Sequence, residues 1–205
     1  GWLLAFHPDL ISQTSLGEHI KDYSFFFYNP EEALHLSQRE KAKAVECICN
    51  IEEELRHAID CHSQILISRY IELLLDHCNR FYERQFITRC EANKKIMKKT
   101  DVLLKDYILS GKLKYNTSPS LGYCAKILQL SSHYFNDLLK FESGKNIDEY
   151  FESKRLEMAK SMLLDSNNTV SVVTEKLGYP NIRYFSRLFK RITGVAPNNY
   201  RLSQN

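Results

Sequence analysis

The C-terminal part of this sequence repeats itself at an offset of about fifty residues. The segment YFNDLLKFESG, residues 134–144, recurs as YFSRLFKRITG, residues 184–194. Upstream of each, the spacing of small and apolar residues at 121–128 recurs at 170–177, one residue out of step. Because that slip falls where a turn is expected, each copy is predicted to be a short helix, a tight turn and a second helix.

Residues that favour helix ends mark both copies. Serine and asparagine cap helix starts, proline suits the first helical position, and glycine favours helix ends. The expected positions are Ser118 with Pro119, Ser131 and Gly144 in the first copy, and Gly178, Asn181 and Gly194 in the second. Between the copies, the capping box of Asn146 and Glu149 predicts a connecting helix. Its length of about 26 Å would hold two recognition helices about one DNA turn apart.

The second helix of each copy is predicted to bury one face and leave the other for a ligand. Phe135, Leu138 and Leu139 share the buried face, as do their counterparts in the second copy. The residues left outward are Ser132, His133, Asn136, Asp137, Ile182, Arg183, Ser186 and Arg187. Arginine can bind guanine, asparagine adenine and aspartate cytosine, and an aliphatic side chain can touch a thymine methyl group. We therefore expect these residues to read base edges in double-stranded DNA.

Charge is distributed unevenly along the chain. Residues 118–205 hold 12 Lys and Arg against 8 Asp and Glu, whereas residues 1–117 hold 16 against 17. Residues at the ends of the recognition helices are expected to contact phosphates, which raises affinity without selecting sequence. They are Ser131, Lys140, Asn181, Lys190 and Arg191. A basic face is often only solvated, and for the outward residues of the first copy both interpretations stay open.

The first ninety residues are expected to form separate parts. Trp2–Phe6 and Tyr23–Tyr28 are short, aromatic and bounded by proline, which predicts two strands within residues 1–36. Ser37 and Glu40 form a capping box that starts a helix over about 37–59, and a stripe of Leu66, Tyr70, Leu73, His77 and Phe81 predicts a second helix. Residues 37–90 are therefore expected to be a helical hairpin, whose stripe is a helix-pair core or a homodimer surface through residues 37–86.

The second copy resembles a family signature. LGYPNIRYFSRLFK, residues 177–190, followed by T-G-x-x-P-x-x-Y-R at 193–201, is similar to the AraC/XylS family of transcription regulators. The resemblance covers about residues 91–205. It implies a DNA-binding domain of seven helices, in which a long helix joins two helix-turn-helix units. The fold class expected is mainly α: a helical hairpin followed by this domain, with a short β remnant at the N-terminus.

The resemblance has further implications and two departures. Residues 1–36 would be the remnant of an effector-sensing β-barrel, and RNA polymerase would be a further partner. Thr174 stands where the family usually has alanine, which is expected to cost a little packing. Asp137 stands where many members carry a basic residue, so the first unit is expected to read a different base or little sequence.

Other classes of function find less support. The sequence has no glycine-rich phosphate loop, nucleophile elbow or paired-carboxylate motif, so we expect neither an enzyme nor a cofactor. His57 and Cys61, spaced by one helical turn, could bind a soft metal with His62, His77 and Cys78. No Cys-x-x-Cys or His-x-x-x-His pair supports this, so no metal is expected. The alternatives are a helical protein-interaction module with a basic face and, third, a thiol- or metal-dependent enzyme.

The expected location is the cytoplasm. The longest apolar stretches are far shorter than the ~20 residues of a membrane helix, and no signal-peptide pattern precedes them. Six irregularly spaced cysteines are typical of reduced thiols. The sequence begins with Gly1 rather than methionine, which indicates a piece of a longer protein.

Overall fold

The computed structural model describes residues 1–114, 118–165 and 167–203. The chain divides into two compact units, an N-terminal unit (Gly1–Cys90) and a C-terminal unit (Glu91–Asn205). Every regular element formed by the described residues is a helix, which confirms the mainly α class.

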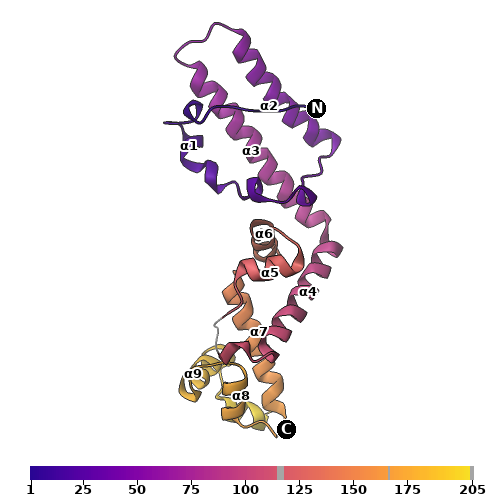
Figure 1. Ribbon diagram of the computed structural model, residues 1–205, viewed down its shortest axis with the longest axis vertical. Coiled ribbons are helices and arrows are strands. Elements are labelled where there is room, and N and C mark those ends of the chain that lie inside the picture. The colour runs from indigo at the N-terminus through magenta and orange to yellow at the C-terminus, as the bar shows by residue number, and fades with distance from the viewer. Residues whose placement is uncertain (115–117, 166, 204–205) are drawn as a thin grey trace. The chain divides into compact units, whose positions relative to one another are not determined.

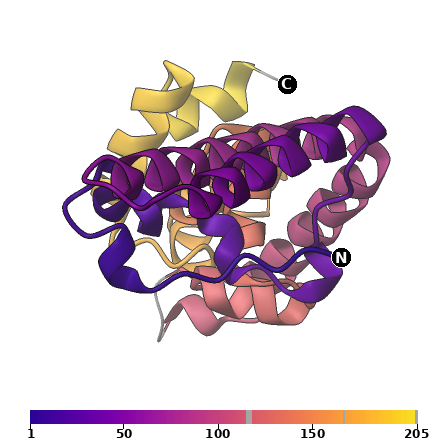
Figure 2. The same ribbon diagram turned by 90° about the horizontal axis from the view of Figure 1, so that it is seen from above.

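A helical hairpin is the framework of the N-terminal unit. It consists of α2 (Gln38–Arg56) and α3 (Ser63–Thr88), which lie side by side in both views (Figures 1 and 2). The predicted capping box starts α2: Ser37 Oγ accepts from the Glu40 N–H, and the Glu40 carboxylate accepts from the Ser37 N–H at 2.7 Å. The helical hairpin is therefore confirmed.

The N-terminal segment packs against α3 through short helical turns. These are η1 (Pro8–Leu10), α1 (Ser15–His19), η2 (Ile20–Asp22), η3 (Ser24–Phe27) and η4 (Pro30–Glu32). Ile11, Leu16 and Tyr23 bury against the hairpin in the core of this unit. Several hydrogen bonds join the segment to α3, among them Ser15 Oγ to Glu72 at 2.8 Å and the Tyr23 hydroxyl to Asp76 at 2.7 Å.

The two predicted strands were wrong. Trp2–Phe6 has no regular secondary structure, and most of Tyr23–Tyr28 is the 3-10 helix η3. Because no described residue offers a partner strand, the backbone closes local bonds instead, such as Tyr28 N–H to Phe25 O at 3.2 Å. The aromatic rings pack on α3, where Phe25 stacks on Tyr82 with centroids 5.5 Å apart. The described residues 1–36 therefore supply no strand of a β-barrel.

The apolar stripe expected on α3 divides between the inside and the surface. Phe81 is buried, but Leu66 and Leu73 are 39% and 45% exposed. The face that packs against α1 and α2 instead centres on Ile67, Ile71, Leu74 and Leu75.

The C-terminal unit contains seven α-helices among its described residues, as predicted. Their bounds, with one 3-10 turn, are α4 (Cys90–Leu109), η5 (Lys112–Lys114), α5 (Leu121–Leu128), α6 (Ser132–Ser143), α7 (Ile147–Leu164), α8 (Val170–Lys176), α9 (Ile182–Thr193) and α10 (Pro197–Ser203). One hydrophobic core joins α4 to α9, with Phe135, Phe151, Phe185 and Phe189 almost fully buried. In Figure 1, α6 and α9 lie towards opposite ends of α7.

The predicted caps hold at most positions. Ser131 and Asn181 cap α6 and α9, while Gly144 and Gly194 end them with φ of 68° and 83°. The cap expected at Ser118 was wrong. Ser120 caps α5, because Ser118 Oγ instead donates to Asp148 Oδ1 at 2.6 Å, near the start of α7.

Candidate nucleic-acid interface

Two helix-turn-helix pairs form in the C-terminal unit, α5 with α6 and α8 with α9. The second helix of each pair buries the predicted face. Phe135, Leu138 and Leu139 are fully buried, and their counterparts Phe185, Leu188 and Phe189 are at most 8% exposed. The opposite faces of α6 and α9 are therefore the ones available to a ligand.

The outward face of α9 is strongly basic. Arg183, Arg187 and Arg191 recur every four residues, so they share one side of the helix, and all three are exposed. Together with Asn181, Tyr184 and Leu188 they line a groove of about 500 Å³, which we call the arginine groove. Ile182 is exposed beside it and Ser186 is half-buried. The arginine groove is lined by guanidinium donors and by one exposed aromatic ring, which suits an anionic ligand with flat bases.

Tyr184 is a candidate that the sequence did not single out. Its counterpart Tyr134 is 4% exposed and serves packing, whereas Tyr184 is 53% exposed and faces the arginine groove. The repeat gives both tyrosines the same place in the pattern. Only their different surroundings separate the two roles.

The outward face of α6 is less open. His133 is exposed, but Ser132, Asn136 and Asp137 are half-buried. Asn136 Nδ2 donates to Asp137 Oδ1 at 3.2 Å, so these side chains partly satisfy one another. Ser132 lies beside α5, since a Cβ on Gly122 would come within 3.7 Å of its hydroxyl. Compared with α9, this face has fewer free donors and no arginine.

The residues expected to contact phosphates divide into two groups. Lys140, Lys190 and Arg191 are exposed at the C-terminal parts of α6 and α9. Ser131 and Asn181 instead use their side-chain oxygens as helix caps, accepting from backbone N–H groups at 3.1 Å and 2.8 Å. Asn181 can still offer its amide Nδ2 at the edge of the arginine groove.

A cluster around Arg155 joins α7 to the turn between α8 and α9. Arg155 Nε and Nη2 both donate to the Leu177 carbonyl, at 3.1 Å and 2.7 Å, and its guanidinium lies 3.9 Å from the centre of the Tyr179 ring. Glu152 pairs with Arg155 at 2.9 Å and accepts from the Tyr179 hydroxyl at 2.8 Å. Sequence reasoning missed this cluster, because its members are far apart in the chain. We call it the Arg155 latch.

The electrostatics of the latch keep Tyr179 protonated. Burial, and then the neighbouring Glu152 carboxylate, raise the pKa of Tyr179 above its ordinary value, while Arg155 opposes them. The Tyr179 hydroxyl is therefore a hydrogen-bond donor at neutral pH. The latch fixes the turn that precedes the arginine groove.

The first half of the unit also touches this turn. Gly178, with φ of 67°, lies against η5: a Cβ at this position would come 2.5 Å from Leu113 Cβ. Only a residue without a side chain allows this approach.

The comparisons with known proteins agree with this geometry. Residues 124–203 match a family model described as a helix-turn-helix domain. The chain carries an AraC-type helix-turn-helix domain. This domain is 39% identical over 77 residues to the HTH-type transcriptional regulator YobQ of Bacillus subtilis, covering 38% of this chain. It is 36% identical over 87 residues, or 42% of this chain, to YtdP of the same organism.

The similarity concerns the AraC-type domain and not the whole relatives. The matched part covers 32% of YobQ and 11% of YtdP. The crystal structure of a DNA-binding transcriptional dual regulator from Escherichia coli K-12 is 17% identical, with a TM-score of 0.45, over 54% of this chain and 94% of that one.

Outside the AraC-type domain, the residues considered as metal ligands are not assembled. The helix α2 ends at Arg56, so His57 and Cys61 lie in a loop and not one helical turn apart. Within residues 1–114, 118–165 and 167–203, no three His, Cys, Asp or Glu side chains converge as a metal site would require. None of the helices in these ranges combines the length and apolar character of a membrane span.

Proposed function

We propose that this chain is a sequence-specific DNA-binding regulator of transcription, in which α6 and α9 enter successive major grooves of one site. The arginine groove on α9 is the observation that carries the proposal. The second helix of this helix-turn-helix, α9, carries three exposed arginines on one face. Such side chains are the hydrogen-bond donors that DNA recognition requires.

In this proposal α9 supplies most of the sequence choice. Arg183 and Arg187 lie in the first half of the helix and bind guanine O6 and N7, while Ile182 touches a thymine methyl group. Lys190 and Arg191, one turn further along, bind phosphates. Tyr184 stacks on a sugar or donates to a phosphate beside the arginines. All of these side chains are exposed on α9, which supports the assignment.

The α6 helix makes a weaker contribution. His133 and Asn136 contact bases. Asp137 accepts a hydrogen bond from cytosine, or its carboxylate only repels DNA phosphates that come too close. Ser132, half-buried against α5, acts with Ser131 and Lys140 at the backbone. The connecting helix α7 has 18 residues. At ~1.5 Å per residue it spans about 27 Å, which suits two readers about one DNA turn apart.

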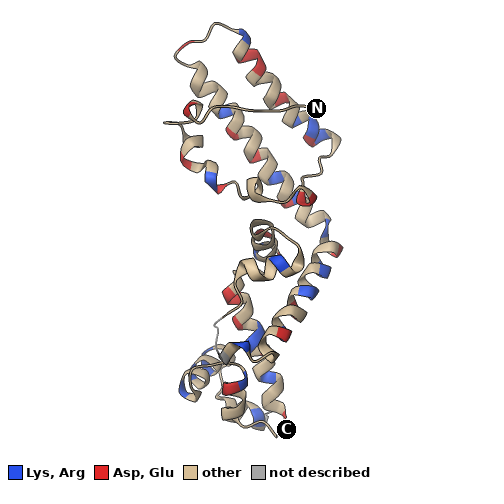
Figure 3. Cartoon of the chain, viewed as in Figure 1, with Lys and Arg blue, Asp and Glu red and all other residues tan. Residues whose placement is uncertain are grey.

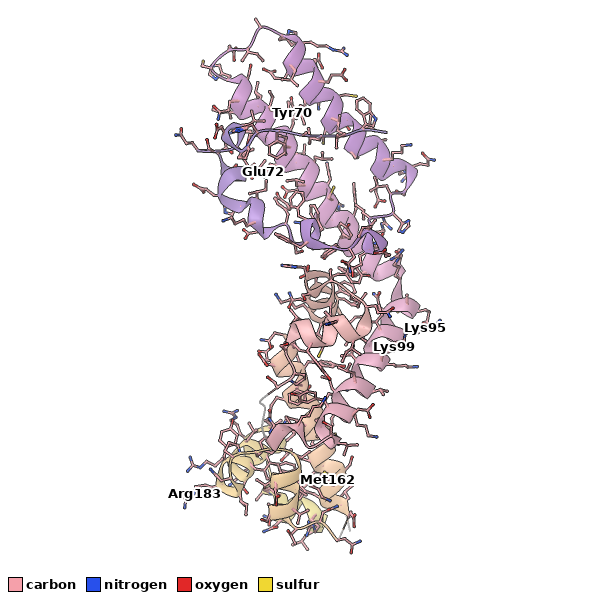
Figure 4. All side chains as sticks on the ribbon, viewed as in Figure 1. Tyr70, Glu72, Lys95, Lys99, Met162 and Arg183 are labelled. Carbon is pink, nitrogen blue, oxygen red and sulfur yellow. The ribbon has the colours of Figure 1, made fainter. Side chains whose placement is uncertain are left out.

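The test is selection of binding sites from a random pool of duplex DNA. The wild-type chain should enrich a site with two elements about one helical turn apart. Arg183→Ala with Arg187→Ala should degrade one element and leave the other. The matched control is Lys95→Ala with Lys99→Ala, which removes the same charge from side chains that project away from Arg183 (Figure 4). That control should keep both elements.

Salt dependence separates this proposal from the interaction-module alternative. A reader that contacts several phosphates should lose affinity steeply between about 50 and 200 mM salt. An apolar helix-groove interaction should change little. An unenriched pool, with weak binding that is indifferent to the two arginines, would contradict the proposal and favour the interaction module.

We also infer that two copies associate through the hairpin of residues 37–86. Leu66 and Leu73, two turns apart on α3, are exposed there, as is Leu55 of α2, so apolar side chains are available to a partner. Sedimentation should give a dimer for the wild-type chain and a monomer for Leu66→Glu with Leu73→Glu. A monomeric wild type at high concentration would exclude this interface. RNA polymerase as a further partner remains a prediction from the family resemblance.

A further inference from the structure

A second groove lies in the C-terminal unit, between α4 and the end of α5. It has a volume of about 600 Å³. The residues that matter here are Lys98, Lys99, Val102 and Asp106 of α4, with Ile127 and Leu128 of α5. We call it the α4–α5 groove, and it shares no residue with the arginine groove.

The floor of the α4–α5 groove is apolar and exposed. Val102 is 59% exposed and Ile127 is 50% exposed, although both are large aliphatic side chains. Leu128 continues this surface towards the core, against which it is packed. Apolar side chains gathered at a concave surface bind other apolar side chains, because both then leave water. The floor is therefore suited to a protein partner, and a phosphate backbone would leave it uncovered.

One end of the groove is positively charged. Lys98 and Lys99 line it, and Lys95 lies one turn earlier on the same helix. The structure gives these three lysines no ion pair with any residue that it describes, and Figure 3 shows the basic residues following one another along α4. Asp106, two turns beyond Lys99, gives the other end the opposite charge. A complementary partner is acidic beside the lysines and neutral or basic beside Asp106.

DNA at the arginine groove does not account for these lysines. Figure 4 shows Lys95 and Lys99 projecting to one side of the C-terminal unit and Arg183 to the other. A duplex bound to α9 would therefore leave the α4 lysines in solvent. The α4–α5 groove stays open to a second partner while DNA is bound.

We propose that the α4–α5 groove binds an amphipathic helix of a partner protein, with its apolar stripe on Val102 and Ile127 and its acidic side chains on Lys98 and Lys99. From Lys98 to Asp106 the groove follows nine residues of α4, about 12 Å along the helix axis, which matches two turns of a docked helix. Such a helix presents apolar residues at positions i, i+3 and i+7 and carboxylates on the flank of its first turn.

The experiment uses a designed probe and the full chain. The probe is a fluorescein-labelled helical peptide of about 14 residues, with leucine at i, i+3 and i+7 and glutamate on the flank. A second peptide has lysine in place of glutamate, and a third has serine in place of leucine. Fluorescence anisotropy should show binding of the glutamate peptide alone. A saturating amount of duplex DNA should leave this binding unchanged.

Charge reversal tests the site. Lys98→Glu with Lys99→Glu should weaken binding of the glutamate peptide at least about fivefold, since each exposed ion pair changes affinity by roughly 1.5- to 5-fold. The same variant should now bind the lysine peptide. The matched control is Lys145→Glu with Lys160→Glu, which makes the same charge change elsewhere in the unit and should leave peptide binding unchanged. Val102→Ser should weaken binding of the glutamate peptide when Lys98 and Lys99 are present, and binding of the lysine peptide when both are replaced by glutamate.

Any of the results that follow would overturn the proposal. They are equal binding of the glutamate and serine peptides, no binding of the glutamate peptide, equal loss in the control variant, and a change of sedimentation in the Lys98 and Lys99 variant. The last would assign the groove to a second copy of the chain. Loss of DNA affinity in that variant, with peptide binding intact, would assign the lysines to DNA. Circular dichroism and thermal unfolding should confirm that each variant is folded.

Discussion

Gly178 illustrates how two halves of the C-terminal unit depend on one missing side chain. Its φ of 67° lies in the left-handed region, and Leu113 of η5 fills the space where a Cβ would stand. Gly144 and Gly194 share the left-handed φ but have no atom within 4 Å of such a Cβ. A substitution at Gly144 or Gly194 would therefore meet conformational strain alone, whereas one at Gly178 would meet conformational strain and steric overlap.

Replacing Gly178 with alanine should destabilise the C-terminal unit by about 2–5 kcal/mol. The left-handed conformation costs about 1–2 kcal/mol, and the overlap with Leu113 adds roughly 1–3 kcal/mol. Gly194→Ala, the matched control, should cost only about 1–2 kcal/mol because it meets no neighbour. Denaturant unfolding of both variants measures the difference. Equal losses would mean that η5 moves aside at little cost.

Single residues also show what the sequence could and could not predict. The apolar positions of the repeat determined which faces of α6 and α9 are buried, because helical periodicity alone decides this. Thr174 is buried and its hydroxyl donates to the Val170 carbonyl at 2.7 Å, a bond that the sequence comparison alone did not indicate. The exposure of Tyr184 and the hydroxyl partner of Ser118 depend on tertiary neighbours, which no local pattern contains.

At the scale of elements, the Arg155 latch connects α7 to the second helix-turn-helix. Two hydrogen bonds to one carbonyl and stacking on Tyr179 need the planar guanidinium, which lysine cannot supply. The latch holds the turn just before α9. It is therefore a positioning device for the arginine groove and makes no contact with the proposed DNA itself.

Arg155→Lys should lower the stability of the C-terminal unit by about 2 kcal/mol, since charge-assisted bonds contribute roughly 1.5–3 kcal/mol. It should also reduce the base preference at the positions that α9 contacts more than at the positions that α6 contacts. Site selection with this variant measures the second effect, which a general loss of stability would not produce on one side only. Lys160→Arg, on the same helix, is the control. An equal reduction at both sets of positions would contradict a positioning role.

The junction between η4 and α2 rests on an ion pair. Arg84 of α3 binds both Glu40 oxygens, at 2.9 Å and 2.7 Å, and the His35 carbonyl at 2.7 Å. Burial acts to raise the pKa of Glu40, but the Ser37 N–H and Arg84 outweigh it and hold the pKa below its ordinary value of 4.5. Glu40 therefore stabilises the folded state only while it is ionised.

Acid should weaken this junction in a defined direction. Because the folded pKa is depressed, the stabilisation from Glu40 is complete above pH 4.5 and is lost as the pH falls below that value through the folded pKa. Thermal unfolding of the wild-type chain and of Glu40→Gln should differ at neutral pH and converge in acid. Glu53→Gln, on the same helix and exposed, should show no such convergence. A difference that is constant with pH would exclude the ionised pair as its source.

The elements themselves were predictable where a periodic pattern and a cap agree. This applies to α2, α6, α7 and α9, each with a capping residue read correctly from the sequence. The expected strands near the N-terminus failed because a short aromatic segment fits a strand or a helical turn equally well. Packing on α3 decided between them.

At the scale of the whole C-terminal unit, one core spans both helix-turn-helix pairs. Since α7 and the shared core leave the pairs little freedom to move apart, the spacing between the two DNA elements should be fixed. A flexible linker would instead tolerate several spacings.

Insertion of base pairs between the two elements tests this rigidity. Five added base pairs turn one element to the opposite side of the duplex and should remove the contribution of one recognition helix. Ten added base pairs restore the facing but increase the separation by about 34 Å, so binding should not recover. Anisotropy titrations with the three duplexes measure the affinities. Recovery at ten base pairs would contradict a rigid unit and would indicate that separate chains occupy the two elements.

The unlike faces of α6 and α9 have one more consequence. The face of α6 carries an aspartate and an asparagine, whereas the face of α9 carries three arginines, and one hydrophobic core holds both helices. A DNA site that fits both helices is therefore asymmetric, and it binds the chain in one orientation along the duplex. If the site is inverted, the bound chain is reversed with it. The α4–α5 groove and the partner bound there would then face away from the start of a gene that they faced before.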